Sequence, residues 1–416
     1  MKTTALLLFI SLLAPVPFSA CSKPEPEDDP IIIAIDNEEY EPIVLTKAEQ
    51  ELNQASNEFG FDVYHKIYSG DDMLISPLSL SLALSMTANG AAGTTEKEML
   101  STLGFAGKDK ETMNNYYQKM IGGLLAADSK TTFEVANSIW ADGKIGVKKS
   151  FTDATTKYYS SEVYPADFST QATVDQINKW CYDKTHGKIP SIMDKPDPDL
   201  VMALINALYF KGEWAFAFNE KTKKEDFATL GGSKNKVDMM SAEDKLLYAE
   251  YDGFSMVQLP YGNGAFCMDV ILPAKNEDFA KAAARFDAKT FDGLIGNRSN
   301  AIVNLKLPKF TFEYNTTLNN ALIALGMETA FSNDKADFSE IADKPLKISV
   351  VKQKTFIDVN EKGTEAAAVT FIGVATTSVG PSPQPKIVDF FADRPFLFII
   401  RENSTGAVLF IGQKVK

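Results

Sequence analysis

The stretch Glu361-Lys362-Gly363-Thr364-Glu365-Ala366-Ala367-Ala368-Val369-Thr370 decides the fold of this chain. A glycine and a threonine are followed by small side chains, and the sequence has no proline from residue 361 to residue 380. A segment that enters between two strands needs compact side chains and no proline, because proline cannot donate a ladder hydrogen bond. The pattern indicates a segment that can be accommodated as an interior strand of a sheet, and that ends before Pro381, Pro383 and Pro385.

Strand alternation from Thr364 onward divides the segment into two faces. One face is uncharged and can be buried: Thr364, Ala366, Ala368, Thr370, Ile372 and Val374. The other face carries Glu365, which can stay in water, with Ala367, Val369, Phe371 and Gly373. The register is therefore self-consistent for insertion, whereas an alanine-rich flexible linker would not need such alternation.

Composition limits the kinds of partner. The chain has 416 residues, 45% of them hydrophobic and 23% charged, which is ordinary globular composition. Its net charge of -13 disfavours a nucleic-acid or polyanion partner, because such surfaces need clustered Lys and Arg. The densest basic run, Lys221 to Lys224, is interrupted by a threonine and followed by acids. We expect no nucleic-acid partner and no heparin-type activator.

The first residues are typical of a targeting segment. Lys2 precedes the apolar run Ala5 to Leu13, and Phe18-Ser19-Ala20-Cys21 follows. This resembles a bacterial lipoprotein signal, with residues 1–20 removed and Cys21 lipidated, although Phe18 replaces the usual aliphatic residue. A plain secretory signal is the alternative. Residues 21–45 begin as an acidic, proline-rich tether, so we expect export across the inner membrane and a lipid anchor in the bacterial cell envelope, or an extracellular protein.

Few residues offer the chemistry of an enzyme or a metal site. The only histidines are His65 and His186, and the sequence lacks HExxH, GxSxG, P-loop and complete GxGxxG motifs. Beyond Cys21, Cys181 and Cys267 are too far apart to indicate a metal site or a disulfide framework. We expect no cofactor, no metal and no catalytic activity.

The pattern along the chain indicates an α+β protein with one large domain at residues 46–416. Thr46-Lys47-Ala48-Glu49 reads as a capping box that opens a helix. Ser76 and Pro77 read as an N-cap and a first-turn proline, and Leu78 to Ala88 follow as a buried helix. Strand-like runs come mainly later: Thr132 to Ile139, Val201 to Phe210, Phe254 to Leu259, Ala265 to Leu272, Ile302 to Phe312, Lys347 to Val359 and Phe396 to Ile400.

Five further motifs follow one another in the order found in a known family. They are Ser76-Pro77-Leu78-Ser79, Asn137-Ser138-Ile139-Trp140, the run from Asn206 to Phe218, Leu307-Pro308-Lys309-Phe310 and Pro395-Phe396-Leu397-Phe398. With the stretch at 361–370, they make the chain resemble the serpins, suicide inhibitors of proteases. The resemblance implies a bundle of helices packed on a large central β-sheet, smaller sheets, and an exposed reactive-centre loop at about 361–394.

The resemblance also implies roles for particular residues. It assigns the hinge of the loop to Glu361, Gly363, Thr364, Glu365, Ala366, Ala367, Ala368 and Val369. It assigns the shutter, where the main sheet parts, to Ser76, Ser79, Asn206 and Gln353, and the breach, where insertion begins, to Trp214, Lys309 and Glu361. Many serpins carry a histidine where Gln353 stands, so we expect sheet opening here to lack histidine-linked pH dependence.

Inhibitory serpins place the scissile residue seventeenth from the hinge glutamate, which implies cleavage of the Thr377–Ser378 bond. Counting back from Pro395 gives a later bond, because the far side of this loop is several residues longer than usual. Val374, Ala375, Thr376 and Thr377 suit the shallow apolar pockets of elastase-like or subtilisin-like serine proteases, and also papain-like cysteine proteases. We expect a monomer that traps its target covalently. The alternative is a non-inhibitory serpin that acts as a binding or chaperone-like protein.

Overall fold

The computed structural model describes residues 40–219, 221–364 and 386–416. Its helices are α1 (Lys47–Ile67), α2 (Pro77–Ala88), α3 (Gly93–Thr102), α4 (Lys110–Ala126), α5 (Lys149–Tyr159), α6 (Gln171–Lys184), α7 (Phe279–Arg285), α8 (Ala288–Gly296), α9 (Asn319–Ala324) and the 3-10 turn η1 (Thr329–Phe331). The expected signal segment and Cys21 lie outside the described residues, as does the tether up to residue 39. In the part of the chain that is described, no helix is both long and apolar enough to span a bilayer.

The two predicted helix starts are confirmed. Thr46 caps α1 through a full capping box with Glu49. The Ser76 hydroxyl accepts a hydrogen bond from the Ser79 amide at the start of α2, with Pro77 in the first turn. Every residue of α2 is buried, including Ser79, Ser81, Ser85 and Thr87, and the helix has no charged side chain that would have to meet water.

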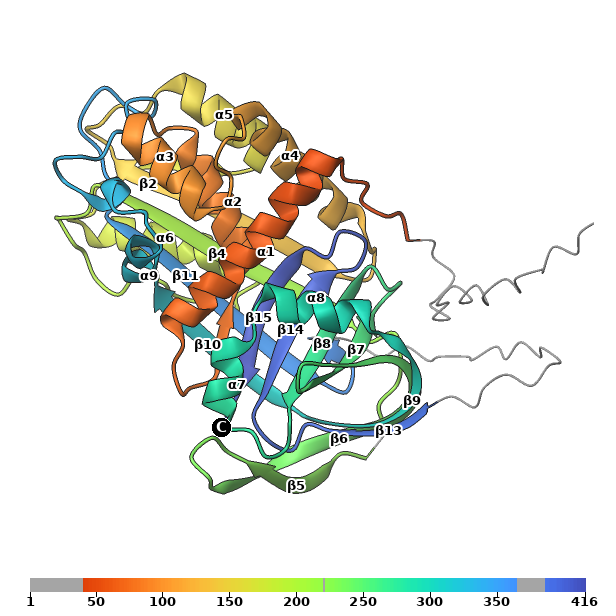
Figure 1. Ribbon diagram of the computed structural model, residues 1–416. Coiled ribbons are helices and arrows are strands. Elements are labelled where there is room, and N and C mark those ends of the chain that lie inside the picture. Colours follow the sequence, from red (N-terminus) through yellow and green to blue (C-terminus); the bar gives the residue numbers. More distant parts are fainter. Residues whose placement is uncertain (1–39, 220, 365–385) are drawn as a thin grey trace, which may run out of the picture. The chain divides into compact units, whose positions relative to one another are not determined.

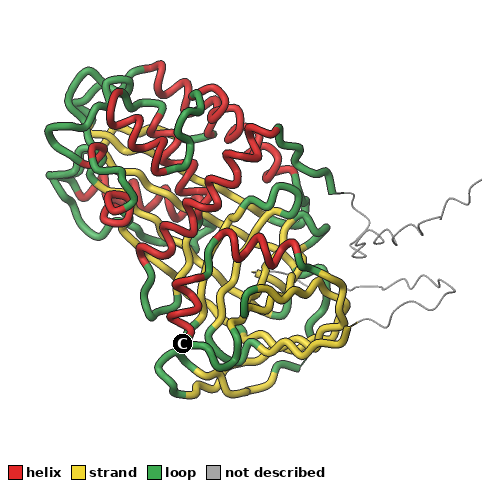
Figure 2. The backbone as a smooth tube through the Cα atoms, in the orientation of Figure 1, coloured by secondary structure: helices red, strands yellow, loops and turns green. Residues whose placement is uncertain are grey.

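A six-stranded sheet holds Asn206 and Gln353 of the predicted shutter and Gly363 and Thr364 of the predicted hinge. Its strands are β2 (Thr132–Asp142), β3 (Glu162–Ala166), β4 (Met202–Glu213), β10 (Phe310–Thr317), β11 (Val350–Asn360) and β12 (Gly363–Thr364). The strand order is β10-β11-β12-β4-β2-β3, with an additional direct pairing between β11 and β4. Figures 1 and 2 show β2, β4 and β11 running side by side, with α1 and α2 over them.

Each face of this sheet packs against a different helix, and β4 explains the division by its period of two. Met202 and Leu204 belong to the core that contains the α2 leucines. Ala203 and Ile205 belong to a second core with Val174, Ile177 and Trp180 of α6. Asn206 continues the first series, so its amide lies on the α2 face of the sheet.

The remaining strands form one continuous nine-stranded ladder. They are β1 (Met73–Ile75), β5 (Lys223–Ala228), β6 (Lys234–Tyr251), β7 (Phe254–Tyr261), β8 (Phe266–Pro273), β9 (Ser299–Pro308), β13 (Lys386–Phe391), β14 (Phe396–Glu402) and β15 (Val408–Lys414). The order is β1-β15-β14-β8-β7-β6-β9-β13, and β5 pairs with β6. The expected smaller sheets are thus joined, because the 18-residue β6 pairs with β5, β7 and β9.

One predicted strand is wrong in its extent. The apolar run Ile302 to Phe312 is two strands, because β9 ends at Pro308 and β10 begins at Phe310 in the other sheet. Proline lacks the amide that a ladder needs, and the Lys309 amide instead donates to the Asp238 carbonyl. The chain therefore changes sheets at Lys309, which places that lysine at the junction.

Candidate functional site

Gln353 joins β11 to β4 and to the first turn of α2. Its side-chain nitrogen donates to the Asn206 side-chain oxygen at 2.8 Å and to the Ser76 carbonyl at 3.1 Å. Its oxygen accepts from the Ser76 amide at 2.9 Å. Gln353 and Asn206 are cross-strand partners, and both are buried. The neutral amide therefore connects a sheet pairing to a buried helix N-terminus without any titrating group.

The same network extends to the next strand through Asn206. Its side-chain nitrogen donates to the Ser79 hydroxyl of α2 and to the Asn137 side-chain oxygen of β2. Asn137 and Asn206 are also cross-strand partners, so three polar residues stand in a row across β2, β4 and β11. The structure thus brings together all four predicted shutter residues, Ser76, Ser79, Asn206 and Gln353.

Asn137 is a member of this network that sequence reasoning used only as part of a strand motif. Its side-chain nitrogen is buried and has no hydrogen-bond partner among the described residues. The signal that would have found it is the antiparallel register of β2 and β4, which a single sequence does not reveal. A buried amide with one unsatisfied group weakens the network by about 1–3 kcal/mol, which favours a sheet that can part.

Two residues of the hinge segment lie in the six-stranded sheet. Gly363 and Thr364 form β12, which pairs antiparallel with Val359 and Asn360 of β11 and with the end of β4. These two residues of the loop expected at about 361–394 are therefore strand residues of the sheet. Their backbone groups find ladder partners on both sides, which a loop in water would have to obtain from solvent.

Glycine is required at position 363. Its φ of +141° is a conformation that residues with a side chain rarely adopt. A Cβ atom there would lie 2.1 Å from the Gly212 carbonyl oxygen and 2.7 Å from the Glu213 Cα. Both are backbone atoms of β4, so they cannot rotate away as a flexible side chain could. The hinge approaches β4 this closely only because the position has no side chain.

Thr364 points inward, as the predicted alternation requires. Its side chain is 2% exposed, and its hydroxyl shares a hydrogen bond of 2.7 Å with the Tyr261 hydroxyl. The Tyr261 ring stacks on Trp214 with centroids 4.4 Å apart. Trp214 in turn donates from its indole nitrogen to the Asn360 carbonyl at 2.9 Å. The stacked rings of Tyr261 and Trp214 therefore hold the hinge through these two hydrogen bonds.

Glu361 and Lys309, predicted as a pair at the breach, are in contact. The ammonium nitrogen of Lys309 lies 2.8 Å from a Glu361 carboxylate oxygen, with the two side chains 38% and 30% exposed. The Thr222 hydroxyl donates to the other Glu361 oxygen. Partial burial works against ionisation, but the Lys309 ammonium and the Thr222 hydroxyl together hold the pKa of Glu361 below its usual range. Such a half-exposed pair positions the hinge and adds little stability.

Below the hinge, β4 and β11 part. Their direct parallel pairing runs from Val350 opposite Ala203 to Lys354 opposite Ala207 and ends there. Further along both strands, Thr364 of β12 lies between them and pairs with Val359 of β11 and Gly212 of β4. Apolar side chains surround Thr364 at this level and leave no room for a water molecule: Leu74, Phe210, Phe356, Ile357, Ile400 and Phe410. The space next to the last described residue of β12 is therefore apolar and closely packed.

Most of the predicted loop residues lie outside the described residues: Glu365, Ala366, Ala367, Ala368, Val369, Val374, Ala375, Thr376, Thr377 and Ser378. The chain is described again from Lys386, which begins β13 and pairs with Ala301 of β9. The Lys386 ammonium lies 3.5 Å from a Glu250 carboxylate oxygen. Lys386 is the only Lys or Arg between the hinge and Arg394, and it lies in a strand of the nine-stranded sheet.

The two histidines and Cys181, whose side chains could take part in catalysis, make contacts typical of structural residues. His65 contacts the Phe286 carbonyl at 3.1 Å, and His186 contacts Glu134 at 2.9 Å. Burial raises the pKa of the Cys181 thiol to about 12, so it stays protonated and unreactive at neutral pH. Within the described ranges, no group of three His, Cys, Asp or Glu side chains could hold a metal ion.

Comparisons with known proteins agree with the fold and with these motifs. The family profile described as Serpin (serine protease inhibitor) matches residues 54–416. Iripin-2 from Ixodes ricinus is 34% identical over 383 residues, covering 89% of this chain and 95% of the relative. A serpin-like protein of Methanosarcina mazei is 32% identical over 374 residues, covering 87% of each chain.

Solved structures give the same answer. The native state of tengpin, a thermophilic serpin, matches with a TM-score of 0.80 and 34% identity, covering 90% of this chain and 95% of tengpin. Thyroxine-binding globulin in complex with thyroxine matches with a TM-score of 0.78 and 26% identity, covering 88% and 99%. The chain belongs to the serpin family, and the predicted α+β serpin fold is confirmed. Proteins of this family are generally protease inhibitors rather than enzymes, although some are non-inhibitory.

Proposed function

We propose that this protein is an inhibitory serpin that traps proteases as covalent acyl-enzymes. The observation that carries the proposal is the position of Gly363 and Thr364 between β4 and β11, above the point where the direct pairing of those strands ends. A strand can be added at this place without opening another edge of the sheet. The residues after Thr364 have only to extend β12 between β4 and β11. The next inward residues of the predicted register, Ala366 and Ala368, are small and uncharged.

The chemical sequence follows from the family mechanism. The protease nucleophile attacks the carbonyl carbon of Thr377, the peptide bond to Ser378 breaks, and the new amine of Ser378 leaves. The ester or thioester that joins Thr377 to the protease remains. Water would normally hydrolyse this bond. Insertion of the freed hinge between β4 and β11 carries the attached protease away and distorts its active site before hydrolysis, and so converts a substrate into a trap.

The target class follows from the residues before the scissile bond. Val374, Ala375, Thr376 and Thr377 are small and uncharged, which suits elastase-like or subtilisin-like serine proteases and also papain-like cysteine proteases. Trypsin-like enzymes need Lys or Arg to meet a buried carboxylate. Lys386 is the only such residue between the hinge and Arg394, and its place in β13 supports the proposal that it is not the scissile residue.

Incubation with pancreatic elastase, followed by a denaturing gel, tests the proposal. We expect a band at the summed mass of the two proteins that resists boiling in detergent, and a released fragment whose first residue is Ser378. Trypsin under the same conditions should give little or no such band. Complete cleavage without an adduct would reject the inhibitory mechanism and favour a non-inhibitory serpin that acts as a binding or chaperone-like protein. A fragment that begins at Ile387 would reject the proposed scissile bond.

We also propose that Cys21 anchors the protein by a lipid in a bacterial cell envelope, where it faces proteases of a host or of neighbouring microbes. The motif Phe18-Ser19-Ala20-Cys21 supports the proposal. The acidic segment after Cys21 would act as a solvated tether. Intact-mass analysis of the protein extracted from native membranes should give a chain that starts at a diacylated or triacylated Cys21. An unmodified N-terminus at or after Cys21 would reject the anchor and leave a secreted inhibitor.

A further inference from the structure

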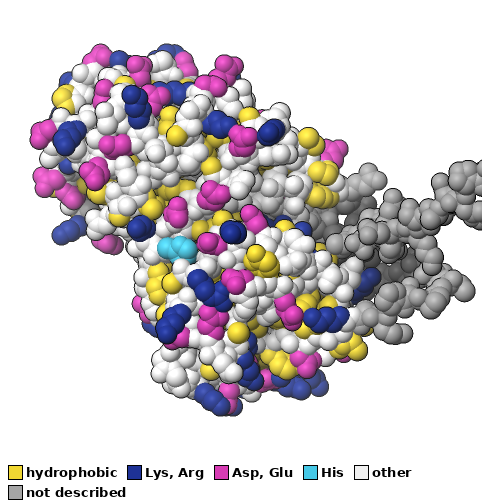
Figure 3. Space-filling model, in the orientation of Figure 1, with side chains coloured by type: hydrophobic (Ala, Val, Ile, Leu, Met, Phe, Trp, Pro, Cys, Tyr) yellow, Lys and Arg dark blue, Asp and Glu magenta, His cyan; other side chains and the backbone are white. Residues whose placement is uncertain are grey.

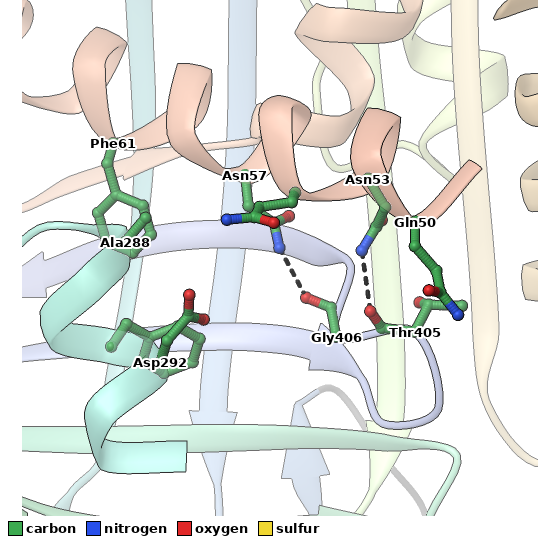
Figure 4. Close-up of a pocket in the computed structure, with 10 residues that line it drawn as sticks. Gln50, Asn53, Asn57, Phe61, Ala288, Asp292, Thr405 and Gly406 are labelled. Carbon is green, nitrogen blue, oxygen red and sulfur yellow. Dashed lines mark hydrogen bonds between the residues drawn. The ribbon is translucent and has the colours of Figure 1, made fainter. Parts of the chain in front are cut away.

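A cavity of about 200 Å³ lies between α1 and α8, beside the turn that joins β14 to β15 (Figure 4). Gln50, Gln54 and Phe61 of α1 line one side, and Phe291 and Asp292 of α8 line the other. None of the shutter or breach residues lines it. Its volume is below the 300–1,000 Å³ of a site for a drug-sized ligand, so the cavity suits a molecule of roughly amino-acid size.

Two asparagines of the cavity wall hold the fold together. The side-chain nitrogens of Asn53 and Asn57 donate to backbone carbonyls of the β14–β15 turn at 2.8 and 2.9 Å, as Figure 4 shows. Their side-chain oxygens accept from the Tyr116 hydroxyl and from the Val408 amide. These two amides therefore fix α1 to the turn, with both their nitrogen and their oxygen already bonded within the protein.

Two glutamines of the same wall have side-chain oxygens that are free to accept. The side-chain nitrogen of Gln50 donates to the Leu45 carbonyl at 3.3 Å, and that of Gln54 donates to a Glu58 carboxylate oxygen at 3.1 Å. Within the described residues, the side-chain oxygens of Gln50 and Gln54 have no donor. Each amide thus keeps its oxygen lone pairs, together with one N–H, for a ligand.

Asp292 adds an uncompensated negative charge. Its carboxylate makes no hydrogen bond or ion pair with any described residue, and Figure 4 shows it directed from α8 toward α1. Burial, together with the neighbouring Glu58 and Asp287 carboxylates, raises the pKa of Asp292. On the face shown in Figure 3, described acidic and basic side chains are interspersed, whereas the Asp292 carboxylate forms no ion pair with a described residue. A positive ligand would offset the repulsion between Asp292 and the neighbouring Glu58 and Asp287 carboxylates.

We propose that this cavity binds a small organic cation, a primary ammonium on an aromatic or aliphatic body. The ammonium donates its three hydrogens to the Asp292 carboxylate and to the side-chain oxygens of Gln50 and Gln54. The apolar body lies against Phe61 and Phe291, which are 2% and 4% exposed and so form a fixed wall. A metal ion suits the site less well, because the described residues offer no group of three His, Cys, Asp or Glu ligands.

Titration calorimetry of the full chain with benzylamine tests this proposal. We expect saturable binding of one benzylamine per chain. Benzyl alcohol, which has the same shape without the charge, and benzoate, which has the opposite charge, should bind at least tenfold more weakly. Asp292→Asn should lower the benzylamine affinity at least tenfold, because it replaces a charge-assisted hydrogen bond by a neutral one. No saturable binding, equal binding of benzyl alcohol, or an unchanged Asp292→Asn titration would each overturn the proposal.

The matched control is Asp62→Asn, which removes an exposed carboxylate of α1 that does not line the cavity, and which should leave the affinity unchanged. Thermal unfolding checks that the Asp292→Asn protein is folded. Gln54→Leu gives a second test at the other wall, since it removes one acceptor without changing the net charge, and it too should weaken benzylamine binding. The experiment contains no protease, so its failure would leave the proposed inhibitory function untouched.

Discussion

Thr364→Arg should convert the inhibitor into a substrate. Thr364 is 2% exposed in the sheet and hydrogen-bonded to Tyr261. An arginine in the same place would bury a charge without a partner, at several kcal/mol, and would lose a hydrogen bond of about 1 kcal/mol. A total of about 4–6 kcal/mol lowers the probability of insertion by roughly three to four powers of ten. Hydrolysis of the acyl-enzyme then precedes trapping.

The intact variant should still fold. Gly363 and Thr364 are the last residues described before position 386, and they form a two-residue strand, so the hinge can avoid the penalty by leaving the sheet without disturbing the rest of the core. The assay is the number of moles of inhibitor consumed per mole of elastase inactivated, read from activity and from the adduct band on a denaturing gel. We expect this number to rise far above that of the unmodified protein, together with complete loop cleavage.

Glu365→Arg is the matched control, because the predicted alternation places position 365 on the outward, solvated face of the inserted strand. It adds the same side chain one residue further along and should leave trapping largely intact. The reasoning is refuted if Thr364→Arg forms adduct as efficiently as the unmodified protein, or if Glu365→Arg fails as completely as Thr364→Arg.

Three other perturbations test the geometry around the hinge and the shutter. Tyr261→Phe keeps the stacking on Trp214 but removes about 1 kcal/mol of hinge anchoring, so hydrogen exchange at the Thr364 amide should become about fivefold faster, and unchanged exchange would contradict this. Gln353→Leu leaves the buried Ser76 amide and the Asn206 side-chain oxygen unpaired and should lower the free energy of unfolding in urea by at least about 2 kcal/mol, whereas a loss below about 1 kcal/mol would exclude a tight network. The pKa of Glu361 is lowered in the folded state, so the pair with Lys309 contributes above the ordinary value of 4.5 and is lost as the pH falls through the lowered pKa. Tryptophan fluorescence should report this acid step as hinge release, and Lys309→Gln should lack it.

Local sequence signals predicted the elements whose causes are local. Capping and apolar period fixed α1 and α2 at Thr46 and Ser76, because an N-cap and a helical period act within a few residues. The pairing of Lys309 with Glu361 could be anticipated only from the resemblance to serpins, since the two residues are 52 positions apart. Their contact depends on the whole sheet, and no local pattern encodes it.

Features that depend on long-range competition were missed. The hairpin of β5 and β6 is rich in charged residues and does not resemble a half-buried strand, yet β6 joins the ladder through partners on both sides. Gly363 and Thr364 can find hydrogen-bond partners either in water, as part of a loop, or on β4 and β11, as part of the sheet. Neither outcome follows from the hinge sequence, which is compatible with both.

The measurement that tests the central claim most directly is the melting temperature of the protein before and after cleavage of the Thr377–Ser378 bond. Reaction with an elastase-type protease yields, beside the adduct, those molecules that are cleaved without trapping, and removal of enzyme and adduct supplies the cleaved form. Cleavage of an ordinary loop leaves stability unchanged or lowers it. If the freed strand continues from Thr364 between β4 and β11, the cleaved form gains ladder hydrogen bonds and loses strain, so it should melt at a clearly higher temperature. Equal or lower melting temperatures for the cleaved form would contradict insertion, and with it the proposed mechanism of inhibition.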